Sequence, residues 1–375
     1  MPGLLPDVDP DGLMEFSVVF TDRSLNHMSN RFQGVMNDIS RTLKDVYNAA
    51  AVAVVPGGGT FGMEAVARQF AQDEQCLVIR NGWFSYRWTQ ILEMGGIPSD
   101  HVVLKARRVA DDPQAPFAPV SADEAVANII EHRPAVVFAP HVETSSGIIL
   151  PDDYIAAIAA ATHEVGGIFV LDCIASGAIW VDMQAHGVDV LISAPQKGWS
   201  ASPCSALVML SDLALERMAT TTSSSFAADL NKWLQIMQAY ENGGHAYHAT
   251  MPTDALTQFR DTMLESGQIG FDRLKEQQLS LGAQVRNALG QRGIKSVAAE
   301  GYEAPGVVVC YTDDGAIQNG SAFVSAGLQI AAGVPLQCDE GDDYRSFRLG
   351  LFGLEKLNNV DRTVATLTDA LDQVL

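Results

Sequence analysis

The stretch Ser193-Ala194-Pro195-Gln196-Lys197-Gly198-Trp199 decides how this chain is interpreted. It follows an apolar run at 188–193, and a second apolar run, which ends in Leu171-Asp172-Cys173-Ile174, lies about one strand–helix unit upstream. In a parallel sheet the carboxyl ends of such runs meet at one edge, where open α/β folds bind ligands. Lys197 and Asp172 are therefore the first candidates for catalysis.

A lysine and an acid placed in this way fit the chemistry of pyridoxal phosphate. The lysine amine forms a Schiff base with the aldehyde of that cofactor. A carboxylate beside the pyridine nitrogen keeps that nitrogen protonated, so that the ring can take up the electrons of a carbanion. The pair predicts an enzyme in which Lys197 carries the cofactor and Asp172 tunes its ring.

Apolar runs alternate with amphipathic segments between residues 51 and 210, which is typical of an α/β domain whose mainly parallel sheet is covered on both faces. The last run follows its predecessor after a short polar loop, so it can run antiparallel. The expected strands are 51–55, 76–80, 101–104, 135–139, 167–171, 188–193 and 206–210, and helices are expected at 123–132 and 152–165.

The composition changes after residue 220, where a Ser/Thr-rich, aromatic and then glycine-rich segment to residue 252 predicts a crossing region. The remaining chain predicts a smaller α+β domain. Its expected elements are a long helix at 256–289, strands at 306–311, 328–331 and 346–351, and a last helix at 358–375. We therefore expect a large domain over 1–255 and a small domain over 256–375.

Charge and composition exclude several classes of partner. The formal net charge of −21 argues against nucleic acid and anionic membrane surfaces, which attract clustered positive charge. Five scattered cysteines without a CxxC spacing argue against a disulfide framework or a zinc site. His245 and His248 lack a third ligand at a matching spacing, so we expect no metal.

The amino-terminal residues and the hydropathy pattern indicate where in the cell the protein is expected. Residues 1–11 are acidic and proline-rich, whereas a secretory signal is basic and then apolar. No apolar run reaches the roughly 20 residues that a helix needs to cross a bilayer. We expect a cytoplasmic protein.

Three further segments place polar or aromatic groups after strands. The turn at 57–60 is glycine-rich and opens a helix, so its backbone amides can approach a phosphate, although a tight turn explains it equally well. Asn81-Gly82-Trp83-Phe84 supplies an aromatic face, and His141-Val142-Glu143-Thr144-Ser145-Ser146-Gly147 supplies hydroxyl groups. Each segment alone is more often structural, but all of them end successive strands.

This ordered set resembles the class V, fold type I pyridoxal-phosphate aminotransferases, most closely the alanine–glyoxylate and serine–pyruvate group. The likeness extends from about residue 36 to the end. The segments that carry it are 57–64, 80–84, 143–147, 171–176, 193–197, Tyr247-His248-Ala249-Thr250-Met251-Pro252 and Phe347-Arg348-Leu349-Gly350. The resemblance implies a mostly parallel seven-stranded sheet in the large domain and a homodimer with shared active sites.

The resemblance also implies a role for each matching residue. Lys197 would bind pyridoxal 5′-phosphate covalently, Asp172 would pair with its ring nitrogen, and Arg348 would anchor the substrate carboxylate. Ile174 and Phe84, or Trp83 in place of Phe84, would contact the two ring faces, and Thr144 would bond near the 3-oxygen. The residues expected to hold the phosphate are Gly58, Gly59, Thr60 and Gln196, joined by Tyr247 and Thr250 from a second subunit.

The implied activity is transfer of an amino group from a small amino acid, of the alanine or serine type, to a 2-oxo acid such as glyoxylate or pyruvate. The chain departs from the family in the substrate-loop segment 1–35, where residues 16–26 replace a Gly-Pro-Gly turn and Arg23 or Asn26 can add a second polar anchor. The alternatives are a lyase of the cysteine desulfurase type that uses Cys338, a transaminase for aminoalkylphosphonates, and a catalytically silent binding protein on the same fold.

Overall fold

The computed structural model describes Asp9 and residues 12–375. The other residues of the segment 1–11, on which the argument against a secretory signal was based, lie outside this described part. None of the helices in the described part is long and apolar enough to cross a membrane.

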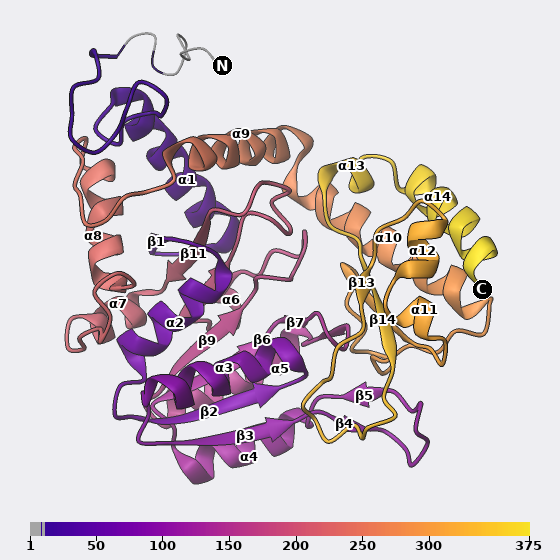
Figure 1. Ribbon diagram of the computed structural model, residues 1–375. Helices are drawn as coiled ribbons and strands as arrows, with labels where there is room; N and C mark the ends of the chain where they lie inside the picture. Colours follow the sequence, from indigo (N-terminus) through magenta and orange to yellow (C-terminus); the bar gives the residue numbers. More distant parts are fainter. Residues whose placement is uncertain (1–8, 10–11) are drawn as a thin grey trace.

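Seven strands of the described chain form one sheet at the centre of the larger lobe (Figure 1). Neighbouring strands pair in parallel except at β11, which is antiparallel to both of its neighbours. In spatial order the strands are β1 (Ala51–Pro56), β11 (Ser205–Leu210), β10 (Val190–Ser193), β9 (Ile168–Asp172), β6 (Val136–Pro140), β2 (Gln75–Arg80) and β3 (Asp100–Lys105). The predicted mostly parallel α/β sheet is confirmed, and the last strand is the reversed one.

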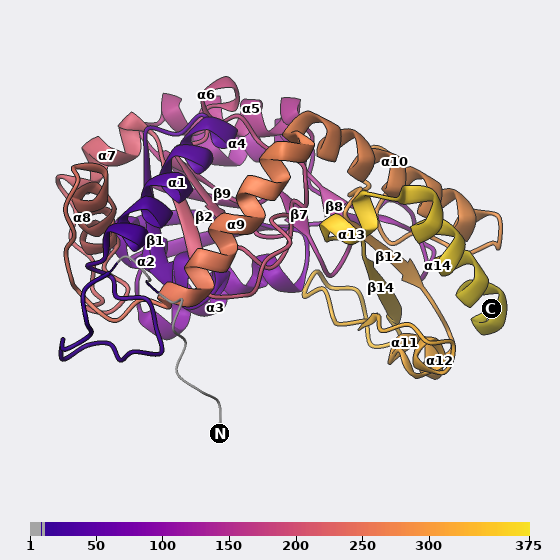
Figure 2. The same ribbon diagram turned by 90° about the horizontal axis from the view of Figure 1, so that it is seen from above.

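Helices cover both faces of this sheet. Figure 2 shows α2 and α3 on one side of the strands and α4, α5 and α6 on the other. The helices of this lobe are α1 (Asn30–Tyr47), α2 (Gly59–Phe70), α3 (Trp83–Gly95), α4 (Ala122–His132), α5 (Asp152–Glu164), α6 (Met183–His186), α7 (Asp212–Met218), α8 (Leu230–Glu241) and α9 (Thr253–Ile269). Helix α8 lies inside the predicted crossing region and packs on β1 and α1.

Local sequence fixes where several of these helices begin. The Ser29 hydroxyl accepts a hydrogen bond from the amide of Phe32 at the start of α1, and Ser121 does the same for Glu124 at the start of α4. Such side chains satisfy amide groups that the first helical turn leaves without a partner. Acids in the first turn of α4 also stabilise the helix, because they interact favourably with the positive end of its dipole.

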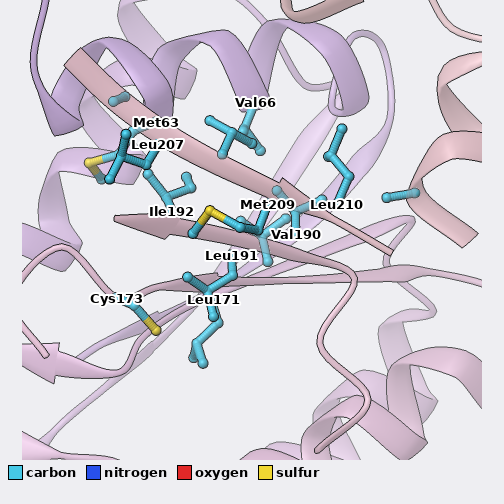
Figure 3. Close-up of a cluster of buried hydrophobic side chains, with 14 of the residues drawn as sticks. Met63, Val66, Leu171, Cys173, Val190, Leu191, Ile192, Leu207, Met209 and Leu210 are labelled. Carbon is cyan, nitrogen blue, oxygen red and sulfur yellow. The ribbon is translucent and has the colours of Figure 1, made fainter. Parts of the chain in front are cut away.

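The core lies where the apolar strands meet the helices. Strands β9, β10 and β11 are buried along their whole length, because side chains on both faces are covered. Figure 3 shows Met63 and Val66 of α2 lying over strand residues that include Ile192 and Leu207. This packing fixes α2, and with it the glycine turn that precedes the helix, against the sheet.

The carboxyl-terminal residues form a smaller lobe with its own apolar cluster (Figures 1 and 2). Its elements are α10 (Phe271–Gly290), β12 (Val307–Tyr311), α11 (Gly315–Gln318), α12 (Ser321–Ser325), β13 (Ala331–Ala332), β14 (Ser346–Gly350), α13 (Leu354–Leu357) and α14 (Val360–Val374). Four two-residue strands complete the fold: β4 (Arg107–Arg108), β5 (Phe117–Ala118), β7 (Val142–Glu143) and β8 (Ile148–Ile149).

Two details differ from the sequence prediction. The single helix expected at 256–289 is wrong, because Gly270 has a φ of 100° and divides the segment into α9 and α10. Glycine adopts this conformation without the steric cost that a side chain brings. The expected strand at 328–331 is also shorter and shifted, to Ala331–Ala332. The domain boundary at 255/256 falls within α9 and stays a prediction.

Substituting Gly62 by alanine tests how closely α2 packs on the sheet. A Cβ atom at Gly62 would lie 2.5 Å from the Cβ of Ala206, so Gly62→Ala overpacks the contact and should lower the free energy of unfolding by about 1–3 kcal/mol. Gly34→Ala is the control, since that position on α1 is open and alanine should add up to about 1 kcal/mol. Urea unfolding measures both, and equal effects would contradict the close packing.

Candidate active site

The predicted catalytic residues lie at the carboxyl edge of the sheet. Asp172 is the last residue of β9, and it pairs in register with Pro140 of β6 on one side and Ile192 of β10 on the other. Lys197 follows the end of β10 by four residues along the chain. Parallel pairing therefore brings the ends of these three strands, and the loops that follow them, to the same place.

Asp172 is a buried carboxylate. Its Oδ1 atom accepts a hydrogen bond of 2.9 Å from the amide of Ile174. The pKa of Asp172 is raised to about 7, mainly by burial and to a lesser extent by the charge of Glu143, against the opposing effects of the Ile174 amide and Arg87. A cation or a charged N–H group beside this carboxylate would favour its ionised form.

The loop that carries Lys197 is held by backbone contact and by aromatic packing. A Cβ atom at Gly198 would lie 2.0 Å from the carbonyl oxygen of Gly177, so only glycine allows the loop to approach this closely. The neighbouring Trp199 is buried, with its ring centre 4.8 Å from that of Trp180. These contacts fix the backbone on either side of the lysine.

Lys197 is partly buried, and its Nζ atom lies 5.4 Å from the centre of the Phe352 ring. Burial lowers the pKa of Lys197, and the positive charges of Arg348 and Arg87 lower it further. A lowered pKa leaves more of the amine neutral near pH 7, which is the form that acts as a nucleophile or base.

The glycine turn at the start of α2 lies directly against Ile174, two residues after Asp172. Gly57 has a φ of 121°, and a Cβ atom at Gly59 would lie 2.4 Å from the Cδ1 atom of Ile174. Thr60, in the first turn of α2, accepts a hydrogen bond of 2.8 Å from Arg87. Among the described residues, the Oε1 atom of Gln196 is buried without a hydrogen-bond partner.

Phe84 lies close to two arginine side chains. Its ring centre is 5.1 Å from the guanidinium carbon of Arg87 and 5.5 Å from that of Arg348. Trp83 instead contacts the ring of Tyr86 at 5.8 Å. Of the two aromatic side chains that the sequence left open, Phe84 is thus the one placed beside Arg348.

Arg348 connects the small lobe to the hydroxyl segment. The residue lies on β14, and its Nε atom donates to the carbonyl oxygen of Ala332 at 2.8 Å. Its Nη1 atom donates to the carbonyl oxygen of Thr144 at 3.5 Å. Burial lowers the pKa of Arg348, against the opposing charge of Glu143. Arg348 and Thr144, two predicted site residues that are distant in sequence, are therefore neighbours.

The sequence interpretation gave no role to Glu143, which organises the start of α3. One carboxylate oxygen of this fully buried side chain accepts from the amides of Phe84 and Ser145, and the other accepts from the amide of Ser85. The hydroxyls of Ser85 and Ser145 also donate to it, each at 2.7 Å. The sequence does show an acid just before a Ser/Thr cluster, which could have suggested a structural role for Glu143. It does not show which backbone amides that acid binds.

Other predicted residues lie apart from this group. Tyr247 and Thr250 are exposed, and their side-chain oxygens lie 3.2 Å apart. Tyr247 also contacts the ring of His27 in the amino-terminal segment. Within the described chain, no hydrogen bond or ring contact joins Tyr247 or Thr250 to the residues around Lys197. Asn26, a candidate second anchor, donates to Glu15 at 2.7 Å.

Cys338 and His141 are buried and have structural partners. The Cys338 thiol donates to the carbonyl oxygen of Arg80, and burial raises its pKa to about 12, with further contributions from Glu143 and Glu340. Burial lowers the pKa of His141 to about 3, so its ring is neutral, with Nδ1 2.7 Å from the Ser176 hydroxyl. The described residues contain no cluster of His, Cys, Asp or Glu that could hold a metal ion.

The substitution Glu143→Gln should disturb the start of α3. A glutamine side chain replaces one accepting oxygen by an NH₂ group, which then faces buried donors, so we expect a loss of about 1–3 kcal/mol in the free energy of unfolding. Urea titration followed by tryptophan fluorescence measures the loss. Glu64→Gln on α2 is the control, because its ion pair with Arg68 is accessible to solvent and such pairs contribute under about 1 kcal/mol. Equal stabilities of the two variants would argue against the network.

Asp172 should make the stability of the ligand-free protein depend on pH. The folded protein raises the pKa of Asp172 from 3.8 to about 7, so the folded state binds a proton more tightly than the unfolded state does. The free energy of unfolding is therefore highest below pH 4 and falls as the pH rises to 7. Asp172→Asn removes this dependence. The variant should gain stability relative to the parent between pH 4 and 7, by on the order of a few kcal/mol. Urea unfolding across this pH range measures the stability of both proteins. A stability difference between variant and parent that does not change with pH would contradict the raised pKa of Asp172.

Comparison with known proteins agrees with this geometry. The family model for class-V aminotransferases matches residues 15–334. An alanine–glyoxylate aminotransferase of Saccharomyces cerevisiae is 25% identical over 358 residues, which cover 89% of this chain and 88% of the relative. A 2-aminoethylphosphonate–pyruvate transaminase of Paraburkholderia xenovorans is 26% identical over 359 residues, which cover 94% of this chain and 90% of the relative.

The fold has close counterparts among solved structures. An alanine–glyoxylate aminotransferase from Nostoc superposes with a TM-score of 0.78 and 21% sequence identity, over 93% of this chain and 88% of the other. The match to the family model extends over most of the sequence and includes the segments around Lys197, Asp172 and the glycine turn. The chain belongs to the class-V aminotransferases.

Proposed function

We propose that this protein is a pyridoxal-phosphate-dependent transaminase that moves an amino group from a small amino acid, of the alanine or serine type, to a 2-oxo acid such as glyoxylate or pyruvate. The observation that carries the proposal is that Asp172 ends β9 and Lys197 lies in the loop that follows β10, the neighbouring strand in register with it. Arg348 and Phe84 lie close to one another at the same site.

The donor set fits the proposed coenzyme, which carries an aldehyde, a phosphate and a basic ring nitrogen. Lys197 has an amine for the aldehyde, and Asp172 has a buried carboxylate for a protonated nitrogen. The turn Gly58-Gly59-Thr60 begins a helix, whose free amides suit a phosphate. Gln196 lies next to Lys197 in sequence, and its Oε1 atom is buried without a protein partner, which fits a ligand that donates a hydrogen bond there; toward a phosphate oxygen the donor would be Nε2.

The remaining assignments of the proposal follow the family pattern. Phe84 and Ile174 would contact the two faces of the coenzyme ring, and Thr144 would bond near its 3-oxygen. Gln196 would join the glycine turn in holding the phosphate. Tyr247 and Thr250 would reach the phosphate of a second subunit in a homodimer, which agrees with their exposure and their separation from the site of their own chain.

When bound, the coenzyme supplies an electron sink for the pair of electrons left behind as the substrate loses its Cα proton. Lys197 has the properties of the group that takes this proton and returns it, because burial and the two arginines favour its neutral amine. Asp172 would hold the ring nitrogen in its protonated form.

Arg348 would orient the substrate by gripping its α-carboxylate. A guanidinium has five N–H donors, of which the carbonyl oxygens of Ala332 and Thr144 each accept one. The partial burial of the side chain strengthens a paired contact with a carboxylate. A fixed carboxylate places the Cα–H bond of the substrate in one orientation, which favours proton transfer.

Two alternatives remain to be compared with this proposal. A cysteine desulfurase requires an accessible, ionisable thiol, whereas Cys338 is 4% exposed and burial raises its pKa to about 12. A transaminase for aminoalkylphosphonates is favoured by the relative from Paraburkholderia. Such a substrate has no α-carboxylate, so Arg348 would have a different task.

A half-reaction screen tests the proposal. Single amines are added to the reconstituted protein, and loss of the visible absorbance of the lysine-bound coenzyme is followed together with the keto product. L-Alanine or L-serine should produce both signals. Arg348→Lys should raise the apparent KM for the amino acid at least about tenfold, because lysine cannot make the paired contact. Lys197→Ala should abolish turnover.

Cys338→Ala is the matched control and should retain the parent activity. A response only to 2-aminoethylphosphonate would replace the substrate class and the role of Arg348. Sulfide release from cysteine that disappears in Cys338→Ala would indicate the lyase. A protein that stays colourless after reconstitution, or a reduced adduct that maps to another residue, would refute the whole proposal.

A further inference from the structure

Arg87 lies at the candidate site and has no role in the assignment above. It belongs to the first two turns of α3, and its Nη1 atom donates to the hydroxyl of Thr60 at 2.8 Å. The contact joins the start of α3 to the amino end of α2. Thr60 is one of the residues proposed to hold the coenzyme phosphate, so the Arg87 guanidinium lies next to the proposed phosphate site.

Two cationic groups lie close to the Phe84 ring. Arg87 and Arg348 both lie within 5.5 Å of the centre of this ring. Their hydrogen-bond partners differ, however, because Arg348 contacts the carbonyl oxygens of Thr144 and Ala332, whereas Arg87 contacts Thr60. The two guanidinium groups therefore bind different segments, Arg87 the start of α2 and Arg348 the segments around Thr144 and Ala332.

Arg87 is available for an anion. No carboxylate within the described residues forms an ion pair with it, although several arginines elsewhere on the chain, such as Arg68 and Arg260, do have such partners. The positive charge of Arg87 also reaches the catalytic pair, since it lowers the pKa of both Lys197 and Asp172. A cation without an acidic partner beside a glycine turn suits a phosphate.

We propose that Arg87 is the positively charged ligand of the coenzyme phosphate, held toward the glycine turn by Thr60 and by the Phe84 ring. This inference rests on the proposed use of pyridoxal phosphate. The Thr60 hydroxyl accepts from Arg87 and keeps its own proton free to donate to a phosphate oxygen. In this arrangement Arg87 binds the coenzyme phosphate, and Arg348 binds the substrate carboxylate.

A coenzyme phosphate adds negative charge that the helix amides balance only in part. The protein has a formal net charge of −21, and a phosphate monoester adds about two more negative charges at neutral pH. Helix amides supply only a partial positive charge to an anion. A guanidinium adds a full charge and donors in a fixed geometry.

Coenzyme binding to the apoprotein tests the inference. The dissociation constants of pyridoxal phosphate and of pyridoxal, which lacks the phosphate, are measured by quenching of tryptophan fluorescence. Arg87→Gln should weaken binding of pyridoxal phosphate at least about tenfold and leave that of pyridoxal within about twofold. Arg87→Lys should fall between the parent and Arg87→Gln. Arg68→Gln, on α2, is the control and should bind both compounds as the parent does.

Each other outcome is informative. Equal weakening for both compounds would overturn the inference, because Arg87 would then act through the Phe84 ring alone. Unchanged coenzyme affinity with a raised KM for substrate would also overturn it and assign Arg87 to the substrate. If Arg87→Gln does not fold, as judged by circular dichroism, the Arg87→Lys comparison decides alone. A parent protein that binds neither compound would refute the proposed function itself, before any variant is compared.

Discussion

The in-register parallel pairing of β6, β9 and β10 is the constraint on which the site depends. It aligns Pro140, Asp172 and Ile192 across three strands, so that the loops after these residues begin at the same level. Each loop then carries a group that the proposed chemistry uses: the hydroxyl segment after β6, the acid at the end of β9 and the lysine after β10. A register shift of one residue would turn Asp172 to the other face of the sheet.

Close contacts at three glycines convert this alignment into a site. Gly59 lies against the side chain of Ile174, Gly82 against that of Ser145, and Gly198 against the backbone of Gly177, and a Cβ atom at any of the three would clash. The loops can therefore approach one another across the edge of the sheet. Glu143 adds a polar connection, because its carboxylate binds the amides at the start of α3 and so fixes where Phe84 lies.

The electrostatics of the site differ from those of the whole molecule. The chain is strongly acidic, yet two arginines, Arg87 and Arg348, act on Lys197 and lower its pKa, after the larger effect of burial. The burial of Lys197 and the positive charges of the two arginines favour its neutral amine, which the proposed proton transfer requires. A high net charge generally favours solubility and does not dictate the charge of a binding site.

The sequence by itself determined much of this protein, because several patterns are local. Apolar runs predicted the strands and the sheet, and the segments around Lys197, Asp172 and the glycine turn predicted the family. The break at Gly270 was missed, since an amphipathic repeat continues on both sides of one glycine and does not show its backbone angle. Only the tertiary structure decided that Phe84 rather than Trp83 lies beside Arg348, that Arg87 contacts Thr60, and that Cys338 is buried. These facts depend on contacts between segments far apart in the chain, and side-chain direction at such contacts follows from packing, which no local pattern encodes.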